Sequence, residues 1–184
     1  MTARLRLRPF TDVDRAPFFA LNTHPLVVES IGSSPTRAES GDMIDRYGEE
    51  LAREGWGLWA VQVTGGASFI GMVGLHRVRE EMPCAPAVEV GWRLHPDHWG
   101  HGYATEAAAA SLQFGFNEAG LREIVAFTTT LNTRSQAVME RIGMTHDAGG
   151  DFDHPALPEG SPLRRHVLYR ISAPSSQVAP SVAP

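Results

Sequence analysis

The sequence contains one cysteine and no lysine among its 184 residues. A single cysteine, Cys84, cannot form a disulfide within the chain, which is typical of proteins in a reducing cytoplasm. Long hydrophobic runs are also missing, since no stretch reaches the roughly 20 apolar residues that a membrane span needs. The first ten residues alternate charged and apolar side chains and lack the apolar core of a signal peptide. We therefore expect a cytoplasmic protein with no membrane partner.

The charge balance and the histidine spacing exclude two further kinds of ligand. The formal net charge is -5, whereas a surface that binds nucleic acid is usually basic. His95, Asp97, His98 and His101 lie close together in the sequence. Their spacing crosses Pro96 and a glycine turn, matches no zinc pattern and includes no cysteine. We expect neither a nucleic-acid partner nor a metal.

The length and composition suit one globular domain. The chain is long enough to bury a substantial core but leaves little room for a second domain. Hydrophobic residues make up 42% and charged residues 20%, both ordinary for a globular protein. The last residues, "APSSQVAPSVAP", are rich in proline, serine and alanine. The sequence therefore predicts a domain at residues 1–172 and a disordered tail at residues 173–184.

Hydrophobic periodicity predicts seven strands and four helices. The strands are expected at residues 4–10, 56–63, 68–78, 87–94, 123–130, 144–148 and 164–172. The helices are expected at residues 11–22, 36–54, 102–118 and 133–142. Thr36 with Glu39, and Thr133 with Gln136, have the spacing expected at helix starts. This order predicts an α/β fold whose sheet mixes strand directions.

The stretch from Leu94 to Ala110, "LHPDHWGHGYATEAAAA", places two glycines directly before an alanine-rich helical run. The first N–H groups of a helix have no partner within the helix, and the helix dipole adds partial positive charge. Gly100 and Gly102 let the backbone approach an anion closely, because no Cβ stands in the way. The segment therefore predicts a phosphate site at the helix start, with an ordinary strand-to-helix turn as the alternative.

Two known phosphate-binding motifs do not fit this stretch. A Walker loop requires lysine, and Thr105 occupies the place of the third glycine in the dinucleotide fingerprint. A third motif fits, because "HWGHGYATEA" resembles the pyrophosphate loop of the GNAT acyl-CoA N-acyltransferases. The resemblance runs from Arg4 to Ile171 and is strongest to the branch of ribosomal-protein N-terminal acetyltransferases. Four segments carry it: "LRLRPFTDVD", "GMVGLHRV", "VEVGWRLHPDHWGHGYATEA" and "NTRSQAVMERIGM".

The resemblance implies one GNAT-type domain of the α/β (α+β) class that uses acetyl-CoA as co-substrate. Its sheet is expected to be mixed and mostly antiparallel, with about seven strands, about four flanking helices and a splay at the central strands. The residues expected to bind acetyl-CoA are Leu94, Trp99, Gly100, His101, Gly102, Tyr103, Ala104, Thr105 and Asn132. Trp99 stands where many members have Gln or Arg, which matters little because backbone amides bind the anion. Asn132 would contact the pantetheine arm, or it is simply a helix cap.

Glu89 is the candidate general base. An alkylamine has a pKa of about 10 and must lose a proton before it attacks a thioester. The resemblance places the thioester beside the strand at 87–94, with a base often at this position acting through water. It also implies that backbone N–H groups near Gly91 stabilise the oxyanion. A salt bridge from Glu89 to Arg93, two rungs away on the same strand face, is the alternative.

Ser135 is the candidate acid for the leaving thiolate. Many members carry a tyrosine seven residues after Asn132, but here that position is Met139, which cannot donate a proton. In the N-terminal acetyltransferase branch a serine follows the asparagine by three residues, and "NTRS" matches this spacing. A serine hydroxyl can hydrogen-bond a thiolate, although serine also simply suits the first turn of a helix.

The acceptor is expected to be a primary amine, either a protein N-terminal α-amine or a small molecule, that attacks directly in a ternary complex. Trp56, beside Gly55 and Gly57, is expected to line the acceptor cleft, and Asp151 would contact the cationic amine. A core tryptophan and a solvated loop charge are the alternatives for these two residues. Because Met139 replaces the tyrosine, a non-catalytic acyl-CoA-binding module is the alternative function. Association into a homodimer is left open.

Overall fold

The computed structural model describes residues 1–174, so the predicted tail lies outside the described residues except for its first two. The α-helices are α1 (Arg15–Thr23), α2 (Pro25–Ile31), α3 (Arg37–Glu54), α4 (Tyr103–Asn117) and α5 (Thr133–Arg141). The strands are β1 (Leu5–Arg8), β2 (Leu58–Val63), β3 (Gly71–Arg77), β4 (Val88–Leu94), β5 (Glu123–Thr129), β6 (Thr145–His146), β7 (Phe152–Asp153) and β8 (Arg165–Ser172). Among residues 1–174, no helix has the length and apolar character needed to cross a bilayer.

All the strands belong to one sheet, in the order β1-β2-β3-β4-β5-β8-β6, and β7 pairs with β8. Every neighbouring pair is antiparallel except β4 and β5, which are parallel. The expected mixed, mostly antiparallel α/β sheet is therefore confirmed. In the described residues the sheet has eight strands where seven were expected, and the chain has five α-helices where four were expected.

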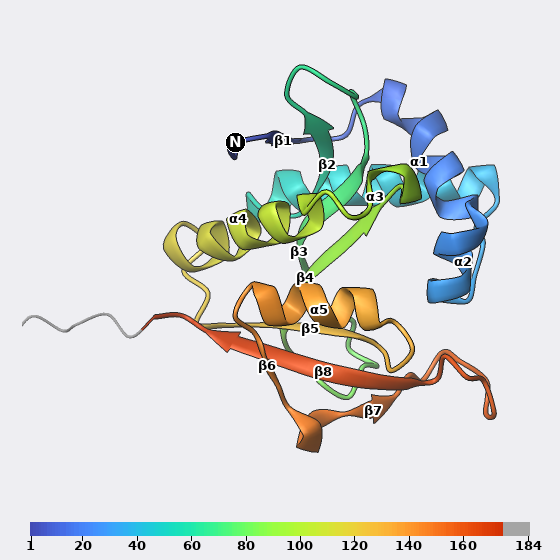
Figure 1. Ribbon diagram of the computed structural model, residues 1–184, viewed down its shortest axis with the longest axis vertical. Helices are drawn as coiled ribbons and strands as arrows, with labels where there is room; N and C mark the ends of the chain where they lie inside the picture. Colours follow the sequence, from blue (N-terminus) through green and yellow to red (C-terminus); the bar gives the residue numbers. More distant parts are fainter. Residues whose placement is uncertain (175–184) are drawn as a thin grey trace, which may run out of the picture.

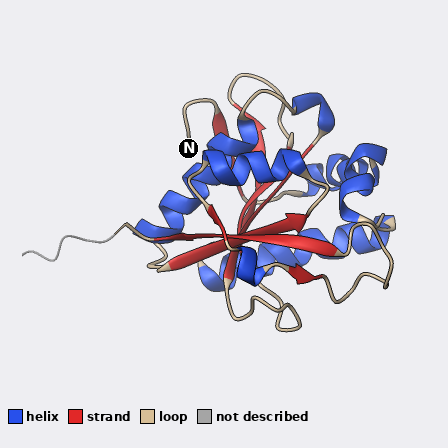
Figure 2. Ribbon diagram, turned by 60° about the horizontal axis from the view of Figure 1, so that its bottom comes forward, coloured by secondary structure: helices blue, strands red, loops and turns tan. Residues whose placement is uncertain are grey.

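Helices cover both faces of the sheet (Figure 2). Helix α4 packs on β3 and β4, with a buried stripe made of Ala107, Ala108, Ser111, Leu112 and Gly115. Ala104 and Phe116 lie four residues to either side of Ala108 and Leu112, but both are only partly buried. Gly115 lets the helix approach the sheet closely, since a Cβ there would lie 2.7 Å from Ile124 and 3.0 Å from Leu75. Helices α1 and α3 cover the opposite face through Phe18, Ile44 and Tyr47, which pack with Leu58 and Met72.

The sheet opens between its two central strands. Strands β4 and β5 share one pair of partners, Glu89 and Val125, although each strand has seven residues. Strand β4 runs on to Leu94 without a partner on its β5 side, whereas β5 pairs with β8 over its whole length. Figure 1 shows the result, with β1–β4 and α4 in one half and β5–β8 and α5 in the other. The expected splay at the central strands is therefore present.

Helix α2 and strand β7 were not expected from the sequence. Helix α2 has seven residues, begins with Pro25 directly after its cap His24, and buries only Val27, so it shows no helical periodicity. Strand β7 has two residues in a segment that reads as a loop. The cap of α5 is Asn132 and not Thr133, because the side chain of Asn132 accepts the N–H of Ser135. Elements this short are set by tertiary contacts and not by local propensity.

A buried ion pair fixes the end of β1 to the segment that follows it. Asp14 is 1% exposed and accepts two hydrogen bonds from the Arg8 guanidinium, at 2.6 and 2.8 Å. Its carboxylate also accepts the backbone N–H and the hydroxyl of Thr11. Burial favours the neutral acid, but the bonds from Arg8 and Thr11 outweigh it and hold the pKa of Asp14 below its usual value. The segment "RPFTDVD" therefore forms a buried joint, in which the Arg8–Asp14 pair holds the end of β1 against the turn that follows it.

Candidate active site

One continuous cleft of about 1910 Å³ extends from the loop before α4, past the free edge of β4, to the strand face that α3 covers. It brings together eleven predicted site residues: Trp56, Glu89, Leu94, Trp99, Gly100, Gly102, Tyr103, Ala104, Thr105, Asn132 and Ser135. Two predicted residues, His101 and Asp151, do not line it. The cleft therefore joins the proposed phosphate loop to the candidate base Glu89.

The loop before α4 presents free backbone donors. Gly100 and Gly102 both have left-handed backbones, with φ of 78° and 76°, which a residue with a Cβ rarely adopts. Gly102 is the N-cap of α4, and no side chain caps the helix. Within residues 1–174, the N–H groups of Tyr103, Ala104 and Thr105 have no hydrogen-bond acceptor. The sequence folds here into three unpaired donors at the positive end of a 15-residue helix.

Arg4, just before β1, holds this loop in place. Its guanidinium donates to the carboxylate of Glu106 at 2.6 Å and to the carbonyl of His101 at 2.9 Å, and it lies over the Tyr103 ring at 4.9 Å. The His101 imidazole stacks on Tyr103 outside the cleft, so the structure does not bring it to the phosphate position. Arg4 has no local sequence signal, because its partner Glu106 is 102 residues away.

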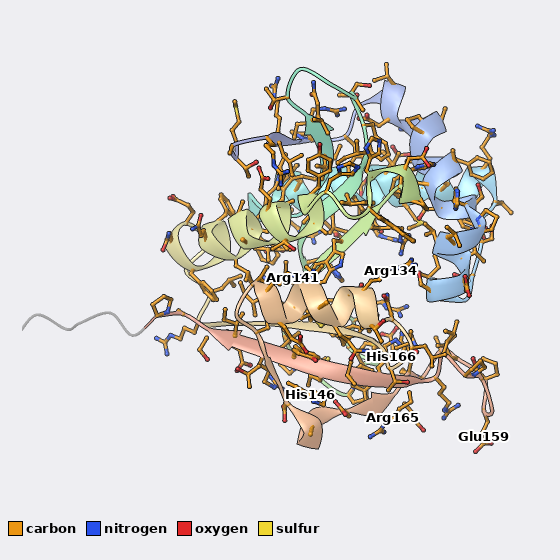
Figure 3. All side chains as sticks on the ribbon, in the orientation of Figure 1. Arg134, Arg141, His146, Glu159, Arg165 and His166 are labelled. Atoms are coloured by element: carbon orange, nitrogen blue, oxygen red, sulfur yellow. The ribbon has the colours of Figure 1, made fainter. Side chains whose placement is uncertain are left out.

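Trp99 and Arg134 form the wall beside the loop. The Trp99 indole N–H donates to the carbonyl of Leu94 at 2.8 Å, and the Arg134 guanidinium lies 4.6 Å from the Trp99 ring centroid. Within the described chain, no carboxylate lies within 4 Å of Arg134. Figure 3 shows Arg134 on the side of α5 that faces the half of the molecule with α4. The sequence analysis missed this cation next to the free amides.

The free edge of β4 can be assigned residue by residue. In an antiparallel pair, the backbone groups of alternate residues point toward the partner strand. The bonds from Val78 to Ala87 and from His95 to Ile70 set the alternation between β3 and β4. The N–H of Gly91 therefore faces β3, and the N–H of Trp92 faces the open side. If this strand stabilises an oxyanion, Trp92 supplies the donor and Gly91 itself does not.

Ser135 reaches this edge from the other half of the molecule. Its hydroxyl oxygen accepts the indole N–H of Trp92 at 3.3 Å, which leaves the hydroxyl proton free to donate elsewhere. The side-chain carbonyl of Asn132 accepts the backbone N–H of Ser135 at 3.1 Å, and the side-chain NH2 of Asn132 donates to the Thr128 hydroxyl at 3.1 Å. Asn132 is thus the cap of α5, as the structural alternative had it. Met139, at the usual tyrosine position, is 1% exposed.

Glu89 pairs with His76 and not with Arg93. The two residues are cross-strand partners on β3 and β4, and His76 Nε2 lies 3.1 Å from a Glu89 carboxylate oxygen. Nδ1 of His76 lies 3.2 Å from the carbonyl of Arg77, so both ring nitrogens face acceptors. Burial alone lowers the pKa of His76, but the charge and hydrogen bond of Glu89 outweigh burial and raise it. The expected alternative of a Glu89–Arg93 salt bridge is wrong, because Arg93 donates to the Asn22 side chain.

The remaining predicted residues have mainly structural contacts. Trp56 is 8% exposed, packs in the main core and also lines the cleft. Asp151 accepts the N–H of Leu168 at 3.0 Å and lies 2.9 Å from the His146 ring, outside the cleft. Residues 1–174 contain no group of three His, Cys, Asp or Glu side chains that could hold a metal.

Two histidines line the wall of the cleft formed by β8 and the loop after β7. His154 and His166 line the cleft with ring centroids 5.0 Å apart (His166 is labelled in Figure 3). Burial lowers the pKa of both imidazoles, which favours their neutral forms. They come from the loop after β7 and from β8, and only the folded sheet brings them together.

Comparisons of the sequence and of the structure with known proteins both match acetyltransferases. The family of the acetyltransferase (GNAT) domain matches residues 4–145. The FsC-acetyl coenzyme A-N(2)-transacetylase of Aspergillus fumigatus is 32% identical over 188 aligned positions, which cover 95% of this chain and 79% of that protein. The crystal structure of an acetyltransferase from Agrobacterium tumefaciens aligns with a TM-score of 0.75 at 27% identity, covering 93% of this chain and 92% of that one.

A more distant structure shares the fold. The spermidine N-acetyltransferase of Vibrio cholerae, solved with CoA and spermine, aligns with a TM-score of 0.71 at 17% identity. The alignment covers 91% of this chain and 95% of that one.

Proposed function

The chain belongs to the GNAT acetyltransferase family, and on that premise we propose that it moves acetyl from acetyl-CoA to a primary amine by direct attack in a ternary complex. It is an acyl-CoA-dependent acetyltransferase, and acetyl-CoA is its co-substrate. The observation that carries the proposal is the row of free N–H groups at Tyr103, Ala104 and Thr105, which opens onto the same cleft as Glu89. This arrangement gives the diphosphate of CoA a site at a helix N-terminus.

The phosphate end would be held by the backbone and by Arg134. Trp99 to Thr105 would surround the diphosphate, and the free guanidinium of Arg134 would add a cation that backbone amides lack. The pantetheine arm would then lie along the open side of β4. At Leu94 the carbonyl already accepts the Trp99 indole, so the arm would pair with the free carbonyl of Trp92 instead, which leaves the N–H of Trp92 for the reaction. Asn132 would contribute through the amide hydrogen that Thr128 does not use.

The reaction would take place beside β4, between the unpaired N–H of Trp92 and the side chain of Glu89. Glu89, acting through water, would accept the proton that the ammonium must lose before its nitrogen attacks. As the C–N bond forms, the N–H of Trp92 would stabilise the oxyanion. The C–S bond then breaks, and the extra proton on the attacking nitrogen passes to the departing thiolate. Ser135 would donate its free hydroxyl proton in a hydrogen bond to the departing thiolate, while the Trp92 indole keeps the oxygen in place.

Two acceptor classes remain in this proposal. The resemblance to ribosomal-protein N-terminal acetyltransferases supports a protein N-terminal α-amine. The structural neighbour from Vibrio cholerae is named for spermidine, a small-molecule amine, which supports a small acceptor.

Thiol release separates this enzyme from a non-catalytic binding module. The purified protein is incubated with acetyl-CoA and a panel of primary amines, and free CoA thiol is followed with time. The proposal predicts amine-dependent thiol release that falls in Glu89→Gln. Binding of acetyl-CoA without thiol release for any amine would favour the binding module, whose single supporting observation is the buried Met139 at the tyrosine position.

A further inference from the structure

Arg93 is a cation in the cleft wall for which the described chain supplies no anion. It lies on the same face of β4 as Glu89 and Gly91, is partly buried and lines the cleft. Its guanidinium donates to the side-chain oxygen of Asn22, which is 0% exposed. Within residues 1–174, no carboxylate lies within 4 Å of Arg93. Four of its five N–H donors therefore remain for other partners.

A second free cation lies near Arg93. Arg46 on α3 also lines the cleft, and it too has no carboxylate within 4 Å in the described chain. The Arg46 guanidinium lies 5.6 Å from the Tyr47 ring centroid. Burial, the largest influence, raises the pKa of Tyr47, while Arg93 and Arg46 both act to lower it. Both guanidinium groups are therefore close enough to act on the one phenol.

The other end of the same cleft is acidic. Glu50 follows Arg46 by four residues, one helical turn, and also lines the cleft. It acts both on His76, the partner of Glu89, and on the Tyr47 phenol, so Glu50 lies between Glu89 and the two cations. Glu89, held by His76, is therefore the acidic group of the cleft that lies away from the two cations.

Gly91 leaves the floor between the two ends open. At about 3.3 Å per residue, the Cα atoms of Glu89 and Arg93 are about 13 Å apart along the strand. A Cβ at Gly91 would lie 3.4 Å from His76 Nε2, so a larger side chain would fill the space between them. An extended chain of several bonds fits that separation.

Resting on the proposed function, we propose that Arg93, with Arg46, binds a carboxylate on the acceptor while the reacting amine lies at the Glu89 end. The acceptor is then a zwitterion whose amine and carboxylate are separated by several bonds. A planar guanidinium fork matches a carboxylate in two parallel hydrogen bonds, and a charge kept in a partly buried wall needs such a counter-ion. A polyamine would meet the two free cations and is disfavoured.

A matched pair of acceptors tests this assignment. 6-Aminohexanoate and 6-aminohexanamide differ only in whether the far end is a carboxylate or a neutral amide, and thiol release gives kcat/KM for each. We expect the carboxylate to be preferred by about tenfold or more, as for one charge-assisted contact. We expect Arg93→Gln to reduce that ratio to about two or less. A ratio near one in the unchanged protein, or a ratio that survives Arg93→Gln, would overturn the assignment.

Two further variants guard against a folding artefact. Asn22→Asp keeps Arg93 but gives it a carboxylate from the protein, and it should lower the ratio as well. Arg53→Gln changes a guanidinium at the cleft rim that already pairs with Glu54 at 3.2 Å, and it should leave the ratio unchanged. If only amines without a carboxylate release thiol, the carboxylate site is wrong and the acetyltransferase stands. If no amine releases thiol, the proposed function itself fails.

Discussion

His76 and Glu89 face each other across β3 and β4, with His76 Nε2 3.1 Å from the Glu89 carboxylate, on the wall of the cleft. The second ring nitrogen of His76 lies beside the carbonyl of Arg77, so the imidazolium form satisfies both contacts. The pair therefore holds Glu89 in one orientation. One carboxylate oxygen contacts His76, which leaves the other for a water or an amine.

Glu89→Gln removes the proposed base while keeping the size of the side chain. We expect kcat to fall by about 10²- to 10⁴-fold, because general base catalysis contributes this much. The affinity for CoA should be unchanged, since Glu89 lies at the start of β4 and the loop before α4 follows the other end of that strand. Thiol-release assays measure kcat, and calorimetric titration with CoA measures the affinity. Equal losses in Glu89→Gln and in the cleft-rim variant Arg53→Gln would argue against a base at Glu89.

The same variant should shift the titration of His76. Burial lowers the pKa of His76 and Glu89 raises it above the ordinary value, so loss of the carboxylate leaves burial dominant and the pKa falls. The C–H resonances of the ring, followed by NMR against pH, report this value. A pKa that stays raised in Glu89→Gln would show that Glu89 is not its cause.

The pair also makes stability depend on pH, with a definite sign. A pKa raised in the folded state means that the pair stabilises the protein below the unfolded pKa of about 6.5, and that this contribution is lost as pH rises through the folded value. His76→Gln should therefore lower the urea midpoint more at pH 6 than at pH 9. A loss that is larger at pH 9 would contradict this account.

Ser135→Ala tests the proposed contact with the thiolate. We expect kcat to fall by roughly tenfold, the size of one lost hydrogen bond to a charged group, with little change in CoA affinity. Thr133→Ala is the matched control, because Thr133 is an exposed hydroxyl residue in the same first turn of α5. If both variants lose the same activity, the effect belongs to the helix turn and not to the Ser135 hydroxyl.

Asp14→Asn tests the joint between β1 and η1 (Asp12–Asp14). Removing one charge of a buried pair costs about 3–5 kcal/mol, so we expect a loss of that order in urea unfolding. The folded pKa of Asp14 is depressed, so its stabilisation is present above the unfolded value of about 3.9 and is lost as pH falls through the folded value. The exposed neighbour Asp12 provides the control, since Asp12→Asn should leave the midpoint unchanged. Similar losses in both variants would refute a buried joint.

The sequence predicted what local patterns determine. Helix α3 was found because Thr36 and Glu39 form a capping box and Gly55 ends the helix with φ of 76°. The loop before α4 was found because Gly100 and Gly102 precede a strong helix former. In both cases the signal and the structure involve residues within a few positions of each other.

Long-range contacts could not be predicted in this way. Arg4 holds Glu106 from 102 residues away, and His76 and Glu89 meet only because β3 and β4 pair in one register. Asp151 was placed at the acceptor from its charge alone, whereas its contacts with His146 and Leu168 depend on how β6 and β8 pair. A single sequence shows the type of each side chain but not which distant partner neutralises it.

Calorimetric titration of CoA into the purified protein and two glycine variants tests the central claim, that backbone N–H groups at the start of α4 hold the diphosphate. Gly102→Val places a branched side chain at φ of 76° beside the free amides, whereas Gly120→Val places it at φ of 65°, beyond the other end of the helix. We predict binding to the unchanged protein and to Gly120→Val, and a loss of at least about 100-fold in affinity for Gly102→Val. CoA affinity that is unchanged in a folded Gly102→Val protein, or absent in all three, would contradict the account.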